Sequence, residues 1–316
     1  MIRVDGIGDA LACVPLIAAL REAGHSVSAL LTTRNADIFA PRTFERVHVV
    51  ERIPWPKHDY TRETWNLALP EARKERYEVA LVASELPAAY VFARRAGIAD
   101  RRGFHNGLQK PFKSFWARRQ LTEAIYRPAH ASHPRHEVEV MYDLGRRLQL
   151  HSEPSKDPQI FRRLLIEGPA EPRNVPVVQV TRKWLTGSRS AEMVRAWFSE
   201  MVADQPIEGF CSSEERELGE RIGSASGLQM RYFQTVREWK TAIAAAPYVI
   251  TPDTGAAHLA GMLGIRCTDI FEPRNFEIQA ARWSPWAAPH VVRSFPTDAQ
   301  GEKNFAAQLL QDIAER

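Results

Sequence analysis

Short apolar runs alternate along the chain with longer segments in which apolar residues recur every three or four positions. The short runs are of strand type because they are rich in Val, Ile and Leu, and they cover residues 1–4, 27–31, 47–50 and 79–83. The longer segments have helical spacing and cover residues 10–23, 62–76, 87–97 and 136–150. Within the first of them, Pro15 is expected to kink the helix or to mark its regular start. Strands that alternate with helices in this way predict a parallel sheet covered on both faces.

Residues 166–176 are dense in Pro and Gly, which is typical of a linker between domains. A second series follows, with strands expected at 177–181, 207–210 and 248–251, and helices at 192–201, from 212 onward and at 236–245. We therefore predict an α/β protein with two Rossmann-like domains, residues 1–168 and residues 169–316. Apolar positions between residues 305 and 313 predict a closing helix, which could also pack back on the first domain.

The stretch from Tyr248 to Gly264 combines a strand-type run, a polar turn and a helix of small residues. The first turn of a helix has unpaired N–H donors and the positive end of the helix dipole, so it suits a phosphate group. Thr254 adds a hydroxyl, and Gly255 and its Ala neighbours leave room for close approach to the backbone. An ordinary connection with a good helix cap would have the same pattern.

A second Gly-rich turn, Asp5-Gly6-Ile7-Gly8-Asp9, follows the first strand and also opens a helix. The dinucleotide fingerprint would need Gly or Ala where Leu11 stands, and no acidic residue marks the end of the second strand. The pattern therefore disfavours NAD as a ligand.

Together the two turns resemble the motifs of the ADP-heptose:lipopolysaccharide heptosyltransferases, glycosyltransferase family 9. The family patterns (S/D)xIGD and (N/T)D(S/T)GxxHLAxALG correspond here to residues 5–9 and 251–264. The resemblance extends over essentially the whole chain, weakly in the middle. It implies the GT-B architecture, in which two Rossmann-like domains with parallel sheets face a central cleft. It also implies inverting transfer of a heptose or related sugar from an ADP-sugar to an acidic lipopolysaccharide-core or other cell-envelope glycan.

The resemblance also implies roles for individual residues. Asp9 corresponds to the catalytic base, although it could be a plain helix cap. The family lysine thought to hold the donor phosphates falls on Gly187, so Lys183 or Arg189 is expected to replace it. The other residues implied for the donor are Thr181, Asp253, Thr254, Gly255, Ala256 and His258, with Ser212, Ser213 and Glu215 in the nucleotide-side loop. Glu272 replaces a family glycine, and is expected either to bind a sugar hydroxyl or to be inert.

Residues 94–119 contain eight Lys or Arg residues against one acid, Asp100, with aromatic residues between them. This pattern fits either a solvated helix face or a surface that binds polyanions. The family resemblance favours an acceptor site, for which the candidates are Gly8, Arg101, Arg102, His105, Lys110 and Lys113. A nucleic-acid partner is not expected, because no recognition motif accompanies the charge.

The composition agrees with a globular protein, at 44% hydrophobic and 25% charged residues, and the net charge of +4 favours anionic partners. Three scattered cysteines favour a reducing cytosol. No apolar run approaches the roughly 18 residues that span a bilayer, and no signal peptide is expected. We therefore predict a cytoplasmic protein, and peripheral contact with the inner membrane surface is compatible with this prediction. No cofactor or metal is expected, since no D-x-D stretch lies near either turn. The alternatives are a UDP- or GDP-hexose donor, or a catalytically silent protein that binds a nucleotide or glycan.

Overall fold

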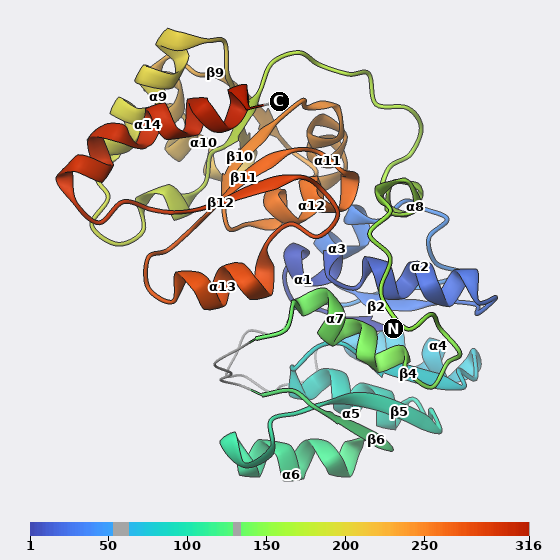
Figure 1. Cartoon of the computed structure of the whole chain (residues 1–316). Helices are drawn as coiled ribbons and strands as arrows, with labels where there is room; N and C mark the ends of the chain where they lie inside the picture. The colour runs from blue at the N-terminus through green and yellow to red at the C-terminus, as the bar shows by residue number, and fades with distance from the viewer. Residues whose placement is uncertain (53–62, 129–133, 316) are drawn as a thin grey trace. The chain divides into compact units, whose positions relative to one another are not determined.

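The computed structural model describes residues 1–52, 63–128 and 134–315 (Figure 1). The chain divides into two compact units. The first comprises Met1–Lys156 with Arg163–Leu165, and the second comprises Asp157–Arg162 with Ile166–Arg316. The boundary expected from the sequence, after residue 168, lies just beyond the last segment of the first unit.

Six parallel strands among the described residues form the sheet of the first unit, in the order β3-β2-β1-β4-β5-β6. The strands are β1 (Ile2–Arg3), β2 (Ala29–Leu31), β3 (Val47–Val49), β4 (Val79–Val82), β5 (Asp100–His105) and β6 (Glu123–Tyr126). The first four lie within the predicted apolar runs. The sequence pattern missed β5 and β6, because β5 begins with the charged residues Asp100, Arg101 and Arg102, which form an ion pair and backbone hydrogen bonds there.

The helical elements of the first unit are α1 (Ile7–Leu11), α2 (Val14–Glu22), α3 (Thr33–Ile38), α4 (Glu63–Lys74), α5 (Pro87–Arg95), the 3₁₀ turn η1 (Gly107–Gln109), α6 (Pro111–Gln120), α7 (Glu137–Tyr142) and the 3₁₀ turn η2 (Asp143–Gly145). The predicted helix 10–23 is thus two helices, and Pro15 lies in the first turn of α2, where it needs no N–H partner. The start of the predicted helix 62–76 at residue 62 lies outside the described residues.

The predicted helix 136–150 was too long. Regular helix ends at Tyr142, and after η2 the chain turns back. A Cβ atom on Gly145 would lie only 2.4 Å from a methyl carbon of Leu150, so a larger residue here would require the Leu150 side chain to shift. The apolar periodicity continued beyond the helix because Leu144 is buried in the same way as the helical Met141.

The second unit has a sheet of six parallel strands in its described part, in the order β12-β11-β10-β7-β8-β9. The strands are β7 (Val177–Gln179), β8 (Glu208–Ser212), β9 (Gln229–Phe233), β10 (Val249–Pro252), β11 (Cys267–Phe271) and β12 (His290–Ser294). The apolar runs predicted β7, β8 and β10. The other three were not predicted; β9 and β12 carry Arg231 and Arg293, and their pattern is weak because they are the outer strands of the sheet.

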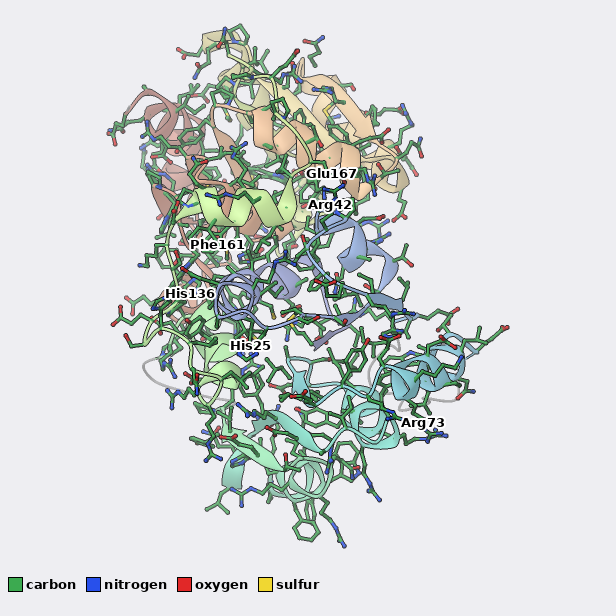
Figure 2. All side chains as sticks on the ribbon, turned by 90° about the vertical axis from the view of Figure 1, so that its right-hand side faces the viewer. His25, Arg42, Arg73, His136, Phe161 and Glu167 are labelled. Carbon is green, nitrogen blue, oxygen red and sulfur yellow. The ribbon has the colours of Figure 1, made fainter. Side chains whose placement is uncertain are left out.

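The second unit also contains helical elements, and the last three residues of one of them, α8, belong to the first unit. The helical elements are α8 (Pro158–Leu165), η3 (Arg182–Leu185), α9 (Ala191–Asp204), η4 (Ser213–Glu215), α10 (Arg216–Leu218), the π-helix η5 (Gly219–Gly223), η6 (Ser224–Ser226), α11 (Val236–Ala245), α12 (Gly255–Leu263), α13 (Phe276–Trp283) and α14 (Ala299–Ala314). The first half of α8 belongs to this unit, and its Phe161, labelled in Figure 2, is fully buried. The closing helix α14 packs within the second unit against α9, with the rings of Trp197 and Phe305 4.8 Å apart.

Each sheet has one face covered by a tight apolar layer. In the first unit, Val4, Leu30 and Val82 pack with Trp65 of α4 and Tyr90 of α5. In the second, residues of β7, β10 and β11 pack with α9 and α14, including Val178, Ile250, Ile270, Phe198 and Leu309. These two separate cores hold the ends of the strands, and so the turns that follow them, in fixed positions.

Both sheets have the doubly wound strand order, which reverses direction once. In such sheets ligands bind beyond the carboxyl ends of the strands at the point of reversal, where two neighbouring connections leave in opposite directions. That point lies between β1 and β4 in the first sheet and between β7 and β10 in the second. The two turns singled out in the sequence follow β1 and β10 directly. The two-domain α/β prediction is therefore confirmed, whereas the central cleft stays a prediction.

Candidate functional site

The turn after β10 is built by Thr254 and two glycines. Thr254 has extended backbone and caps α12 by accepting a hydrogen bond from the Ala256 N–H at 3.2 Å. Gly264 ends the helix with φ of 70°, a conformation that favours glycine. Gly261 allows close packing, because a Cβ atom there would lie 2.8 Å from the backbone nitrogen of Trp286. The small residues of this stretch thus fix the position and direction of α12.

Three charged or polar groups meet at this turn. Lys183, which follows β7, lies with its Nζ 3.2 Å from Asp253 Oδ2 and also donates to the Asp253 backbone carbonyl. On the other side, His258 Nε2 lies 3.6 Å from Asp253 Oδ1, and the His258 ring lies 5.4 Å from that of Trp283. Burial alone would raise the pKa of Asp253, but His258 and Lys183 outweigh it and hold that pKa below its ordinary value. Asp253 is therefore an ionised group that orders the turn.

Arg189, the other candidate for the missing lysine, is engaged elsewhere. Its guanidinium forms a bidentate pair with Glu272, at 3.1 and 2.5 Å, and donates to the carbonyls of Trp184 and Lys183. It also stacks on the ring of Phe295, 3.6 Å from the centroid. The residue that replaces the family glycine, Glu272, is thus the partner of Arg189. Of the two cations, Lys183 is the one that the structure brings to the turn.

The nucleotide-side loop named from the sequence lies at the same edge of the sheet, because it follows β8, the neighbour of β7. Ser212 caps η4 by accepting a hydrogen bond from the Glu214 N–H at 3.2 Å. Glu215 pairs with Arg182 at 3.1 Å, which joins this loop to η3. Thr181 caps η3 in turn, by accepting from the Lys183 N–H. The predicted donor residues other than Arg189 therefore line one edge of the second sheet.

A carboxyl group that the sequence did not single out lies beneath this edge. Asp269, in the middle of β11, is fully buried, and neither of its oxygens has a hydrogen bond of ordinary geometry from any described residue. Burial, with the nearby Asp253 charge, raises the pKa of Asp269 well above its ordinary value. Burial therefore favours the protonated form of the Asp269 carboxyl over a wider pH range than for an exposed carboxyl. In the sequence, the sign of this buried carboxyl group is a single Asp within an otherwise uncharged strand.

In the first unit, the turn after β1 is organised around the buried Arg3. Its guanidinium pairs with Asp9 Oδ1 and lies 3.6 Å from Asp5 Oδ2, and it also donates to the Ala83 carbonyl. Burial would lower the pKa of Arg3, but the two carboxylates outweigh it and raise that pKa. Asp9 Oδ2 accepts the Gly6 N–H at 3.0 Å, as in a capping box. Both oxygens of Asp9 are thus engaged.

Asp5 differs from Asp9 in its surroundings. It is largely buried, its Oδ2 has no hydrogen-bond partner among the described residues, and it lines a cavity of 540 Å³. Burial raises the pKa of Asp5, although Arg3 opposes that effect. A carboxylate of raised pKa that faces a cavity is suited to accept a proton. The sequence suggested Asp9 only, since the family motif ends on that residue.

Two of the predicted acceptor residues, Lys110 and Lys113, line the same cavity, together with Glu85, Leu86, Pro111 and Phe112. Lys113 pairs with Glu85, whose other oxygen accepts from Arg127 at 2.6 Å. Arg127 in turn pairs with the buried Glu137 of α7. Burial alone would raise the pKa of Glu85, but Arg127 and Lys113 outweigh it and lower that pKa. Glu85 and Arg127 were missed, although Glu85 lies three residues beyond β4 and Arg127 directly follows β6, at the strand ends where sites in such sheets form.

The other predicted acceptor residues are not among those that line this cavity, and Gly8 belongs to α1 beside Asp9. Arg101 and Arg102 stand at the beginning of β5, toward the opposite edge of the sheet, and bond backbone carbonyls or pair with Asp100. His105 ends β5, accepts the Gly107 N–H and contacts Arg118 at 3.2 Å. Burial and the Arg118 charge lower the pKa of His105, so it is neutral at pH 7. The helix cap His136, labelled in Figure 2, accepts the Val138 N–H.

Two further properties concern metals and membranes. Within residues 1–52, 63–128 and 134–315, no three His, Cys, Asp or Glu side chains gather as a metal site would require. In the same ranges, no helix has both the length and the apolar content needed to cross a bilayer. Metal independence stays a prediction.

Comparison with known proteins gives structural likeness only. A scan against family models matched none, and a search among curated proteins found no match. Among solved structures, the Escherichia coli heptosyltransferase WaaC with ADP has a TM-score of 0.70 at 16% identity, covering 99% of this chain and 98% of its own. A glycosyltransferase family 9 protein from Veillonella parvula has a TM-score of 0.65 at 13% identity, covering 97% and 88%. The E. coli ADP-heptose heptosyltransferase II has a TM-score of 0.64 at 13% identity, covering 99% and 97%.

These solved structures include heptosyltransferases and a family 9 protein, the family whose motifs the two turns resemble. The resemblance is therefore confirmed at the level of the fold. The likeness covers both units and nearly the whole chain. The chain has the two-domain α/β fold of the GT-B glycosyltransferases, as heptosyltransferases and family 9 proteins do.

Proposed function

We propose that the protein is a glycosyltransferase of the family 9 type. It transfers a heptose or related sugar from an ADP-sugar to an acidic lipopolysaccharide-core or other cell-envelope glycan, with inversion and without a metal. The observation that carries this proposal is the position of the two family motifs. Each follows directly on a strand at the reversal point of its own sheet, where doubly wound folds bind ligands.

The second unit is proposed to bind the donor. The N-terminus of α12 offers N–H donors and a positive dipole end to the diphosphate, and the Lys183 ammonium lies at the same turn. Lys183 and His258 hold Asp253, so the negative charge beside the proposed phosphate position is compensated. The fold relative WaaC has been solved with ADP and with ADP-2-deoxy-2-fluoro heptose, which supports an ADP-sugar as the donor.

The first unit is proposed to bind the acceptor and to supply the base. An acceptor hydroxyl loses its proton to a carboxylate, its oxygen bonds to the anomeric carbon, and the bond from that carbon to the diphosphate breaks, releasing ADP. Asp9 is the base that the motif indicates. Because Arg3 and the Gly6 N–H occupy its oxygens, it takes the proton late, as the new bond forms. Asp5 is a second carboxylate at the same turn that faces the cavity.

Lys110 and Lys113 are proposed to hold the acidic groups of the acceptor, since both line the cavity that contains Asp5. A lipid-linked acceptor would place the protein in the cytoplasm with peripheral contact to the inner membrane. A UDP- or GDP-hexose donor is the rival within the same reaction, because Gly187 stands where the family has its lysine. A silent binding protein is the rival from another class.

A thermal-shift panel with ADP, UDP, GDP, CMP and NAD at equal concentration tests the proposal. A ligand at about 100 times its dissociation constant stabilises the protein by about 2.7 kcal/mol. Stabilisation by ADP alone supports the ADP-sugar donor, and preference for UDP or GDP moves the donor but keeps the reaction. Stabilisation by none of the five would contradict nucleotide binding at this site.

Turnover of the nucleotide sugar by an Asp9→Ala variant separates the enzyme from the silent binding protein. The enzyme loses turnover by at least about 100-fold while its nucleotide affinity is unchanged. A wild-type protein that binds the nucleotide sugar but never turns it over would favour the silent binding protein.

A further inference from the structure

The two most exposed large apolar side chains among the described residues lie in one short segment, with a third exposed ring beside them. Leu108 of η1 is 95% exposed, and Phe112 and Phe115 of α6 are 90% and 65% exposed. Phe112 and Phe115 are three residues apart, so they share one face of α6, while Ser114 and Ala117 on its other face are buried. We call Leu108, Phe112 and Phe115 the apolar ridge. In Figure 1, α6 lies at one end of the first unit, next to β5 and β6.

The segment that carries the apolar ridge is rich in basic residues, of which Lys113 is paired with Glu85. Residues 107–122 contain Lys110, Lys113, Arg118 and Arg119 and no acidic residue. The Arg119 guanidinium lies over the Phe115 ring, 5.3 Å from its centroid, so cation and ring face the same side. Tyr126 of β6, which is 56% exposed, packs close to Gly107 at the base of η1. Apolar residues flanked by cations and an interfacial tyrosine match the chemistry of an anionic lipid surface.

The apolar ridge also adjoins the cavity of the first unit. Phe112 belongs to both, and Lys110 and Lys113 line the cavity from the same segment that carries the ridge. Asp5 and Glu85, the latter paired with Lys113, line the same cavity. A molecule anchored in a bilayer at the ridge would therefore have its polar part next to the carboxylates of the turn after β1.

We propose that the apolar ridge inserts into the interface of an anionic membrane and delivers the head of a lipid-anchored acceptor to the 540 Å³ cavity. Membrane binding by this surface stands on its own geometry and charge. Delivery of the acceptor rests on the proposed function. The partner is the lipid bilayer, recognised by its apolar interior and its negative surface.

Co-sedimentation with vesicles tests the first part. Wild-type protein is mixed with vesicles of phosphatidylcholine alone, or of phosphatidylcholine and phosphatidylglycerol in equal parts. Each cation near an anionic surface strengthens binding about fivefold, so two of the four predict more than about tenfold tighter binding to the anionic vesicles. A triple variant with Leu108→Ser, Phe112→Ser and Phe115→Ser is expected to bind them at least about tenfold more weakly.

Leu67→Ser is the matched control, since Leu67 is 65% exposed on α4 of the same unit and lies outside the ridge. It should bind vesicles as the wild type does. Circular dichroism checks that the triple variant is folded. Equal binding by the triple variant and the wild type, or equal loss in the control, overturns the proposal. The proposal is also overturned if the wild type is a dimer that does not bind vesicles and the triple variant is a monomer, because the ridge would then join two copies.

ADP-induced thermal shifts separate this proposal from the proposed function. The triple variant should keep the wild-type response to ADP, since the ridge lies in the first unit and the donor turn in the second. Vesicle binding without any nucleotide response supports the ridge and contradicts the transferase. Turnover that is equally fast with a vesicle-bound acceptor for wild type and triple variant would overturn delivery by the ridge.

Discussion

Lys183→Met tests whether a relocated cation holds the donor phosphates. The substitution keeps an unbranched apolar stem and removes the ammonium, which lies 3.2 Å from Asp253 Oδ2. On binding, the ammonium would turn from this carboxylate to the diphosphate. Without it, His258 is the remaining side-chain neighbour of the Asp253 carboxylate among the described residues, and the Asp253 charge opposes the incoming phosphate.

The expected effect follows from charge and exposure. Two opposite charges about 4 Å apart attract by about 4 kcal/mol at an effective dielectric constant of about 20. The Lys183 side chain is 52% exposed, so water and salt screen much of this attraction. A charge-assisted hydrogen bond to a diphosphate in such a place is worth about 1–2 kcal/mol. The dissociation constant for ADP should therefore rise about 5- to 30-fold.

Isothermal titration of ADP at two salt concentrations measures the change. The wild type should lose affinity in high salt more steeply than Lys183→Met, because the variant has one fewer cation at the phosphate. Arg182→Met is the matched control. The Arg182 side chain adjoins Lys183 in the sequence, is 80% exposed and pairs with Glu215 instead of Asp253. An unchanged dissociation constant for Lys183→Met, or an equal loss for Arg182→Met, would refute the assignment. Arg189→Met should lower the free energy of unfolding and have a smaller effect on the affinity for ADP, because Arg189 is paired with Glu272.

Three more predictions concern the protonation and packing of the two sites. Asp269→Asn should stabilise the second unit increasingly as pH rises. The raised pKa means that folded Asp269 keeps its proton where the unfolded chain loses it, so wild-type stability falls by up to about 1.4 kcal/mol per pH unit above about pH 4. Gly261→Ala should destabilise by about 1–3 kcal/mol, since the new Cβ would lie 2.8 Å from Pro285 Cβ. Asp5→Asn should remove the acid limb of the pH profile of kcat/KM, because the raised pKa of Asp5 means that this carboxylate becomes protonated at a higher pH than an ordinary carboxylate. Asp9→Asn, in contrast, should lower kcat at every pH.

Urea unfolding at several pH values checks the first of these, and a stability difference between Asp269→Asn and wild type that does not change with pH would contradict it. The same method at one pH checks Gly261→Ala, and an unchanged midpoint would mean that residues 285 and 286 yield to the new methyl group. Turnover of the nucleotide sugar as a function of pH checks the carboxylates. An acid limb that persists in Asp5→Asn would assign that limb to another group.

Local chemistry made the two turns visible in the sequence. Each combines a short apolar run, a glycine or hydroxyl residue at a helix start and small residues beyond it, and each of these preferences acts within a few positions. The same is true of the alternation that predicted two α/β domains. Such features depend on neighbours along the chain, so the pattern of residues alone determines them. The elements it missed, such as β5, begin with charges that the fold pairs or bonds to backbone carbonyls.

Only the tertiary structure decided which side chains meet. Arg189 and Glu272 are 83 positions apart, and their pairing removes Arg189 from the candidates for phosphate binding and leaves Lys183. Asp5, Glu85 and Lys113 share one cavity because β1 and β4 are neighbours in the sheet, not in the sequence. The sequence alone determined what each turn can do by its backbone. The charge and protonation of the groups around it depend on burial and on distant partners, which exist only once the strands have been placed side by side.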